Sequence, residues 1–148
     1  MRQILRNVSA LGVLAVVFCA SCGGGRIPWR AAPIQGSGIM VTPTETYVQG
    51  HLLNVRTTFM NQGPLPITVN RDAVQLIMPD GRVVARSSGT YTQHTPYVIM
   101  PGMSHAVWVD FRAEGWRWQE LPGAQVNWGP AVSVNGQPVA IGPMALAP

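Results

Sequence analysis

The chain has 148 residues, ten arginines, no lysine and six acidic residues, and its formal net charge at pH 7 is +4. The arginines are dispersed along the sequence, whereas nucleic-acid-binding proteins carry a clustered basic face, so no nucleic acid partner is expected. The length corresponds to a single domain that is large enough to bury a core.

The first 25 residues have the layout of an export signal. Arg2 and Arg6 come first, an apolar run extends from residue 8 to residue 20, and small residues follow. This run is too short to span a bilayer comfortably as a helix. Its end, Ala20–Ser21–Cys22, resembles the lipobox of bacterial lipoproteins, in which small residues precede a cysteine that is acylated and becomes the first mature residue. Cys19 stands where that family prefers leucine.

This resemblance implies a signal peptide over residues 1–21 and a lipidated Cys22 that attaches the chain to a membrane through its acyl chains. Signal cleavage removes Cys19 and lipid occupies Cys22, so neither a disulfide nor a thiolate metal site is expected. Gly23, in place of an aspartate, resembles the pattern that permits transfer to the outer membrane. The expected location is therefore the cell envelope, with the protein lipid-anchored on the periplasmic face or the cell surface.

The glycine and proline content of residues 22–37 predicts a flexible tether. A domain is expected to follow at residues 38–148. Its first predicted strand, Ile39–Val48, is interrupted by Pro43, which is typical of an edge strand because proline lacks the backbone donor.

Alternating apolar side chains predict further strands in this domain. In His51–Asn61, apolar residues and threonine occupy every second position, as a half-buried strand requires. The alternation resumes at Leu65, Ile67 and Val69 after a turn cluster. It appears again in Asp72–Met78 and in Ser104–Arg112.

Two turn sequences predict hairpins. Pro79–Asp80–Gly81 separates two strand patterns, and Asn135–Gly136 has the residues that a type I′ turn prefers. Pro138 places the return strand of the second hairpin at a sheet edge. Only residues 113–121 are expected to hold a short helical turn. Seven to nine short strands without intervening helices predict an antiparallel sandwich or barrel.

The turn and core residues also resemble the small immunoglobulin-like sandwiches of bacterial lipoproteins, over roughly residues 38–143. The resemblance implies an all-β fold, a single antiparallel immunoglobulin-like sandwich of about seven to nine strands, without the inter-sheet disulfide. It is nearly silent on activity. The residues that carry it are Phe59–Met60–Asn61, Gly63, Pro66–Ile67, Val69, Val74, Leu76, Asp80–Gly81–Arg82 and Met100–Pro101–Gly102.

No catalytic constellation is recognisable in the sequence. The six acidic residues show no spacing that assigns acid and base roles, and no Gly-x-Ser-x-Gly or phosphate-cradling glycine motif occurs. We therefore expect a protein that is not an enzyme and that has no cofactor.

A metal site is one alternative. His94, Met100, Met103 and His105 fall within twelve residues, and thioether with imidazole suits Cu(I). The set loosely resembles the Met and His ligands of periplasmic copper carriers. In a second interpretation, Met103 and His105 share the strand parity of Val107 and point toward the end of the core, where methionine fills gaps.

Aromatic residues suggest a binding surface in the loop at residues 112–125. Trp116, Arg117, Trp118 and Trp128 offer large contact area and a planar donor for a glycan or a partner's backbone. In a second interpretation, one tryptophan plugs the open end of the sandwich and another lies on its surface.

These observations predict a membrane-anchored envelope lipoprotein whose non-catalytic β-sandwich presents a binding or scaffolding surface to an envelope protein or glycan. Two alternatives stay open at this point. One is a periplasmic Cu(I) carrier, and the other is a structural subunit of a larger envelope complex.

Overall fold

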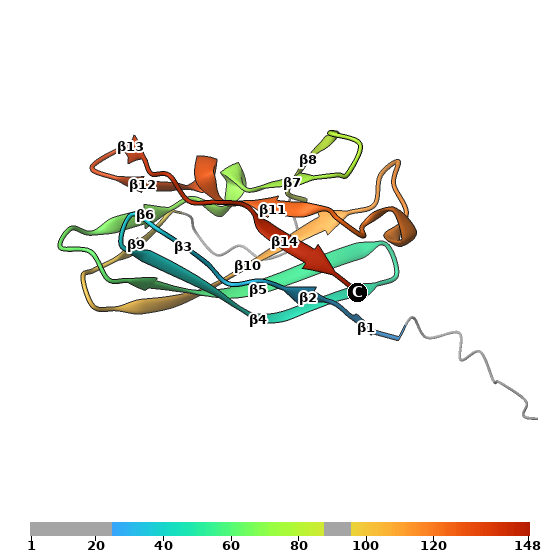
Figure 1. The fold of residues 1–148 in the computed structure, drawn as a ribbon, viewed down its shortest axis with the longest axis horizontal. Coiled ribbons are helices and arrows are strands. Elements are labelled where there is room, and N and C mark those ends of the chain that lie inside the picture. Colours follow the sequence, from blue (N-terminus) through green and yellow to red (C-terminus); the bar gives the residue numbers. More distant parts are fainter. Residues whose placement is uncertain (1–24, 88–95) are drawn as a thin grey trace, which may run out of the picture.

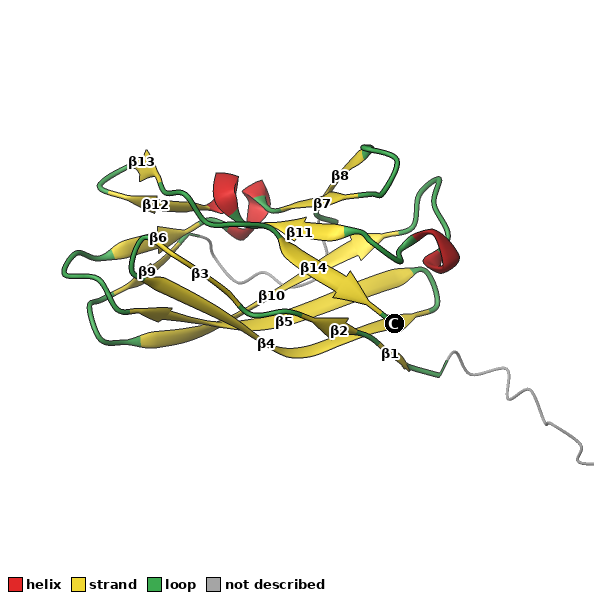
Figure 2. Cartoon of the chain, viewed as in Figure 1, coloured by secondary structure: helices red, strands yellow, loops and turns green. Residues whose placement is uncertain are grey.

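The computed structural model describes residues 25–87 and 96–148. Strands form almost all of the regular structure of these residues, and every strand pair is antiparallel (Figures 1 and 2). The all-β prediction is confirmed. The described residues contain fourteen strands rather than seven to nine, because several have only two or three residues, too few to show an alternating pattern.

The strands form three sheets. Sheet 1 contains β1 (Ile27–Pro28), β3 (Ile34–Gly36), β4 (Ile39–Gln49), β5 (Leu52–Asn61) and β10 (Ser104–Arg112). Sheet 2 contains β2 (Arg30–Ala31), β14 (Met144–Ala147), β11 (Gln125–Asn127), β7 (Gln75–Ile77) and β8 (Val83–Ala85). Sheet 3 contains β13 (Gln137–Pro138), β12 (Val132–Val134), β6 (Ile67–Val69) and β9 (Tyr97–Ile99). Three 3₁₀ helices complete the described part: η1 (Arg71–Ala73), η2 (Trp118–Glu120) and η3 (Gly129–Ala131).

The long strands β5 and β10 form as their alternation predicts. Leu53, Val55, Thr57 and Phe59 of β5 are buried, and the residues between them face outward. β10 has the predicted bounds and pairs with β5 so that Val109 lies opposite Val55. Thr57 is polar yet buried, and its Oγ1 donates a hydrogen bond to the carbonyl oxygen of Val107 at 3.1 Å, which satisfies the hydroxyl.

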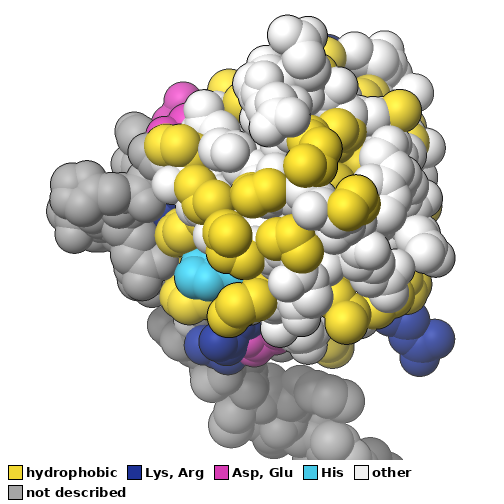
Figure 3. Space-filling model, turned by 90° about the vertical axis from the view of Figure 1, so that its left-hand side faces the viewer, with side chains coloured by type: hydrophobic (Ala, Val, Ile, Leu, Met, Phe, Trp, Pro, Cys, Tyr) yellow, Lys and Arg dark blue, Asp and Glu magenta, His cyan; other side chains and the backbone are white. Residues whose placement is uncertain are grey.

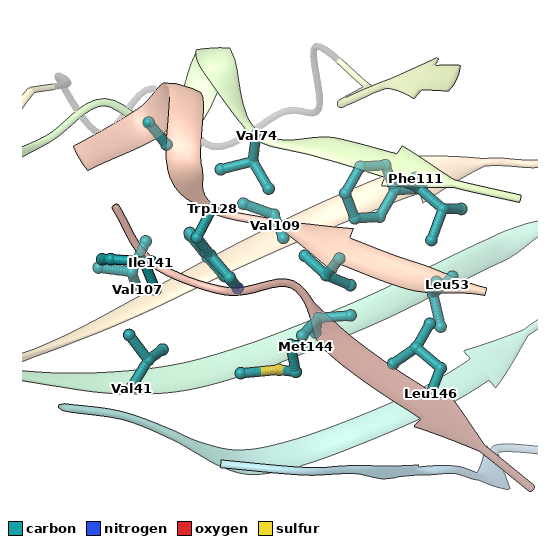
Figure 4. Packing of buried hydrophobic residues seen from close by; sticks show 14 of the residues in the cluster. Val41, Leu53, Val74, Val107, Val109, Phe111, Trp128, Ile141, Met144 and Leu146 are labelled. Atoms are coloured by element: carbon teal, nitrogen blue, oxygen red, sulfur yellow. The ribbon is translucent and has the colours of Figure 1, made fainter. Parts of the chain in front are cut away.

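The core lies between sheet 1 and the strands and loops above it (Figures 1 and 4). In Figure 4, side chains of β4, β5 and β10 point toward those of β14 and of the segments around Trp128 and Ile141. The buried apolar residues form one cluster that draws on all three sheets. A single continuous core is what holds the layers together.

Both predicted hairpins are present. β7 pairs with β8 across the Pro79–Asp80–Gly81 turn, and β12 pairs with β13. Asn135 and Gly136 have φ angles of 50° and 76°, as a type I′ turn requires. β13, which contains Pro138, is the edge strand of sheet 3, as predicted.

β4 is not an edge strand, contrary to the prediction from Pro43. It pairs with β5 on one side, and with β1 and β3 on the other. The two N-terminal strands cover its ends and leave a gap around Pro43, where the pairing with β5 is also irregular. On the side of β4 away from β5, no strand pairs with Pro43, so its missing backbone donor costs no ladder hydrogen bond there.

The prediction of a flexible tether up to residue 37 is wrong for residues 27–36. β1 and β3 add to sheet 1, whereas β2 between them pairs with β14 in sheet 2, so this segment straps the two sheets together. Trp29 is buried, and its backbone N–H donates to the carbonyl oxygen of Thr46 at 2.8 Å. Gly36 serves packing, since a Cβ there would lie 2.6 Å from the carbonyl oxygen of Ala140.

Candidate binding surfaces

The structure separates the four residues of the predicted aromatic surface. Trp128 is completely buried and packs edge-on against Phe59, with 4.9 Å between the ring centroids. Trp116 is also buried, and its Nε1 donates to the carbonyl oxygen of Arg112 at 3.1 Å. Trp118 is 43% exposed and Arg117 is exposed. Trp116 therefore plugs the end of the core and Trp118 lies on the surface, while Trp128 contributes to no exposed platform.

A hollow of about 430 Å³ separates the loop that carries these residues from the β4–β5 turn. Gly50 and His51 of the turn form one side, Trp116 contributes to its lining, and Arg117 and Trp118 form the other side. We call this surface, defined by Gly50, His51, Arg117 and Trp118, the hairpin end.

Arg82 holds the hairpin-end loop in place. Its Nε donates to Oδ2 of Asp80 at 2.6 Å, its Nη1 to the carbonyl oxygen of Gly115 at 2.8 Å, and its Nη2 to Oε2 of Glu120 at 2.6 Å. Hydrogen bonds from the backbone and side chain of Arg82 keep the pKa of Asp80 below its usual value. Hydrogen bonds to Glu120 and Asp80 raise the pKa of Arg82. One guanidinium therefore joins the β7–β8 turn to the loop before β11.

The predicted copper ligands lie at the opposite end of the domain. Met100 and Met103 are joined by a turn, in which the N–H of Met103 donates to the carbonyl oxygen of Met100 at 3.0 Å. Met103 is 58% exposed and His105 is also exposed, so neither points into the core as the second interpretation expected. The His105 ring lies against that of Tyr97, with centroids 4.6 Å apart. His94 lies outside the described residues.

This Met-rich end is apolar. Figure 3 views the end that carries the β5–β6, β9–β10 and β12–β13 turns and shows apolar side chains gathered on it. Leu65, which continued the predicted alternation, is 46% exposed. No group of three His, Cys, Asp or Glu side chains arranged to hold a metal occurs within residues 25–87 and 96–148, so a metal here would depend on thioethers. The exposed large apolar residues at this end are Met60, Leu65, Val98, Met100 and Met103.

A third surface, which the sequence pattern did not predict, lies on the outer face of sheet 1. Strand register places Tyr47, Asn54 and Asp110 side by side across β4, β5 and β10. A second row, two residues further along each strand, consists of Glu45, Arg56 and Trp108. All six alternate with residues that face the core, and together with the backbone of Val55 they surround a hollow of about 250 Å³. We call this surface the outer-face groove.

Arginine side chains lie over both aromatic rings of the groove. The guanidinium carbon of Arg56 is 4.8 Å from the centroid of Trp108, and that of Arg26 is 4.4 Å from the centroid of Tyr47. Arg26 also forms an ion pair with Glu45 at 3.1 Å. Within the described part of the chain, no carboxylate pairs with Arg56, so its donors stay available to a ligand.

Asp110 contributes a half-buried carboxylate. Burial raises its pKa above the usual value for aspartate, and the positive charges of Arg86 and Arg71 oppose that effect. Among the described residues, the backbone N–H and the Oγ of Ser87 both donate hydrogen bonds to Asp110, each at 2.8 Å. Both bonds end on the backbone oxygen of Asp110. Among residues 25–87 and 96–148, no hydrogen bond reaches its side-chain carboxylate at the groove. Trp108 and Asp110 share one face of β10, and their spacing in the sequence indicates this. Their neighbours on β4 and β5 cannot be identified from the sequence.

These features define the chain as an all-β protein of antiparallel sheets with a polar and aromatic outer groove. No protein-family model matches the chain, and no curated protein sequence is significantly similar to it. It is similar to the crystal structure of the yjhA protein from Bacillus subtilis, with a TM-score of 0.50 and 11% identity over 67% of this chain and 78% of that one.

A functionally unknown protein from Listeria monocytogenes is also similar, with a TM-score of 0.50 and 10% identity over 83% of this chain and 89% of that chain. At such identities the likeness concerns the fold alone. In addition, none of the helices among the described residues is both long and apolar enough to cross a membrane.

Proposed function

We propose that the chain is a lipid-anchored envelope lipoprotein whose non-catalytic, immunoglobulin-like β-sandwich binds another envelope component. The lipobox resemblance at Cys22 supports the anchor, and the outer membrane is the proposed location. The arrangement of sheet 1 opposite sheet 2 around one core supports the sandwich assignment. The fold supplies a rigid body on which a binding surface is displayed.

The outer-face groove is the observation that carries the binding proposal, and an envelope glycan is the ligand that fits it. Sugar rings present apolar C–H faces and many hydroxyl groups. The Arg26–Tyr47 and Arg56–Trp108 pairs, each with a guanidinium over a ring, offer flat surfaces for stacking. The carboxylate of Asp110 and the carboxamide of Asn54 accept hydrogen bonds from hydroxyls, and Arg56 donates to an acetamido carbonyl.

The position of the acidic residues supports binding without catalysis. Glu45 and Asp110 both border the groove, but they lie two strands apart and two residues apart along the strand direction. Strand spacing and rise place their Cα atoms about 12 Å apart. Carboxyl groups that act on one glycosidic bond lie about 5–9.5 Å apart, which these backbone positions allow only if both side chains point toward each other. Glu45 is in addition engaged by Arg26.

Replacing Trp108 with alanine is expected to weaken binding of a β-1,4-linked N-acetylglucosamine tetramer at least tenfold, because central aromatic contacts dominate such interfaces. The measurement is titration calorimetry of the mature protein with this oligosaccharide. Trp118→Ala is the matched control, since it removes an exposed indole at the hairpin end and should leave affinity unchanged. Absence of binding by the unmodified protein, or equal loss in both variants, rejects the glycan assignment.

The exposed thioethers of the Met-rich end support a second candidate, a periplasmic Cu(I) carrier. Met100, Met103 and His105 are all exposed at this end, and Met103 and His105 have the same strand parity. Thioether and imidazole are suitable Cu(I) ligands. The same apolar end also supports the third candidate, a structural subunit of an envelope complex that covers it on assembly.

If Cu(I) binds there, the variant Met100→Leu/Met103→Leu should lose at least 90% of the metal that the unmodified protein withdraws from a chromogenic Cu(I) chelator. Leucine keeps the volume and apolar character of methionine, so folding is preserved. The control is Met78→Leu, which alters a buried thioether beside the β7–β8 turn, away from the Met-rich end. Equal copper uptake by the double variant and the control contradicts this candidate, as does the absence of uptake by the unmodified protein.

A further inference from the structure

The first described strand, β1, begins much closer to Cys22 than the sequence pattern implied. Residues 23–26 are all that separate Cys22 from β1, and β1 is paired with β4 immediately before the β4–β5 turn, with Ile27 opposite Val48. An extended chain spans at most about 3.5 Å per residue. The five steps from Cys22 to Ile27 therefore cover no more than about 18 Å.

This short connection determines which surface faces the membrane, given the acylation of Cys22 that the proposed function requires. Figure 1 shows β1, the β4–β5 turn and the loop before β11 at the same end of the domain. Val48, the pairing partner of Ile27, also borders the hollow of the hairpin end. An anchor within about 18 Å of Ile27 therefore brings the hairpin end to the headgroup region of the bilayer.

The side chains exposed at this end suit a membrane interface. Trp118 is exposed on the loop before β11, and Ile27 is exposed beside the anchor. Tryptophan prefers the headgroup level because it has an apolar body and a polar N–H. Arg117 lies next to Trp118, and its apolar stem with a charged head is suited to the same boundary.

The charges at this end complement an anionic surface. Arg30, Arg112 and Arg117 are exposed and make no ion pair with a carboxylate of the described residues. The nearby acids are mostly neutralised, because Arg82 binds Asp80 and Glu120, and Arg26 binds Glu45. Glu114 is the exception. Arginines near an anionic leaflet each contribute on the order of 1 kcal/mol of attraction.

We infer that the hairpin end docks on anionic phospholipid headgroups beside the acylated Cys22. The domain then stands with β4 and β5 leading away from the bilayer, and the Met-rich end projects farthest from it. The outer-face groove lies on the side of the domain, accessible to a ligand that extends along the membrane.

The test uses the mature acylated protein in vesicles of phosphatidylglycerol and phosphatidylcholine that carry bromine atoms near the headgroup end of their acyl chains. Bromine is expected to quench at least 15% of the tryptophan fluorescence. Trp118→Ala should abolish that quenching. Trp108→Ala, which removes an indole on the outer face, should leave it intact. The double variant Arg112→Gln/Arg117→Gln should reduce it at least twofold, as should replacing the anionic lipid with phosphatidylcholine.

The inference rests on the proposed lipid anchor. Two measurements distinguish a failure of the anchor from a failure of the docking inference. Mass spectrometry of the N-terminal peptide reports whether Cys22 carries acyl chains; if it does not, the anchor is rejected and the docking inference with it. An acylated Cys22 together with unquenched tryptophan, or quenching that persists in Trp118→Ala, overturns the docking inference and leaves the anchor standing.

Discussion

Replacing Trp128 with alanine is expected to lower the free energy of unfolding by about 3–5 kcal/mol, the range for deletion of a large aromatic from a packed core. Trp128 has no exposed surface, and its ring meets Phe59 edge-on at 4.9 Å. Figure 4 shows its side chain among residues of sheet 1 and of the segment that leads to β14. Alanine would leave a cavity between the layers that the surrounding strands cannot fill. Urea denaturation measured by circular dichroism provides the comparison.

Two further variants distinguish this explanation from a general effect of losing an indole. Trp118→Ala removes the same side chain from an exposed position and should change stability by about 0.5 kcal/mol or less. Trp128→Phe should cost less than Trp128→Ala. Nε1 of Trp128 has no hydrogen-bond acceptor among the described residues, so phenylalanine sacrifices volume but no hydrogen bond. Equal losses in Trp128→Ala and Trp118→Ala would refute the assignment of Trp128 to the core.

Asn61→Ala is expected to lower the free energy of unfolding by about 3 kcal/mol, because buried carbonyls left without a donor cost about 1–3 kcal/mol each. The side-chain amide is completely buried and donates to the carbonyl oxygens of Leu65 at 2.8 Å and Ile99 at 2.9 Å. Its Oδ1 accepts from the N–H of Gly63 at 3.0 Å. One amide therefore fixes the turn after β5 and joins it to β9.

The controls for Asn61 separate geometry from hydrogen bonding. Asn61→Asp keeps the size and the acceptor for Gly63 but removes both donors, so we expect it to destabilise the domain at least as much as alanine does. Gln62→Ala changes the exposed neighbour in the same turn and should have little effect. Thermal unfolding of the three variants at one pH gives the order. A stability of Asn61→Asp close to that of the unmodified protein would contradict the role of the two donors.

The strands that the sequence predicts most directly are those whose signals are local. The bounds of β10 were predicted to the residue, and the β12–β13 hairpin formed at Asn135–Gly136, because alternation and turn chemistry depend on neighbours within a few positions. The segment at residues 27–36 was not predicted to form strands, because these strands pair with distant parts of the chain. The glycine and proline content of this segment indicates a tether, and only the pairing with β4 and β14 makes it part of the domain.

For the candidate surfaces too, the sequence predicted some features and the fold decided others. Arg117 and Trp118 are exposed as predicted, whereas Trp116 and Trp128 entered the core, since composition does not distinguish a tryptophan that stacks on a ligand from one that fills the gap between sheets. The outer-face groove was not predicted, because its residues come from three strands that only the fold brings together.

By itself, the sequence determined the all-β class, the position of the long strands, the inward face of β5 and the turns of both hairpins, because a period of two and the φ preferences of Asn and Gly are local properties. The tertiary structure decided which strands are neighbours. Tyr47, Asn54 and Asp110 come from distant parts of the chain and meet in one row only through the register of β4, β5 and β10. Register is set when whole strand faces pack against the core, so the sequence of one strand alone does not determine which residues lie opposite it.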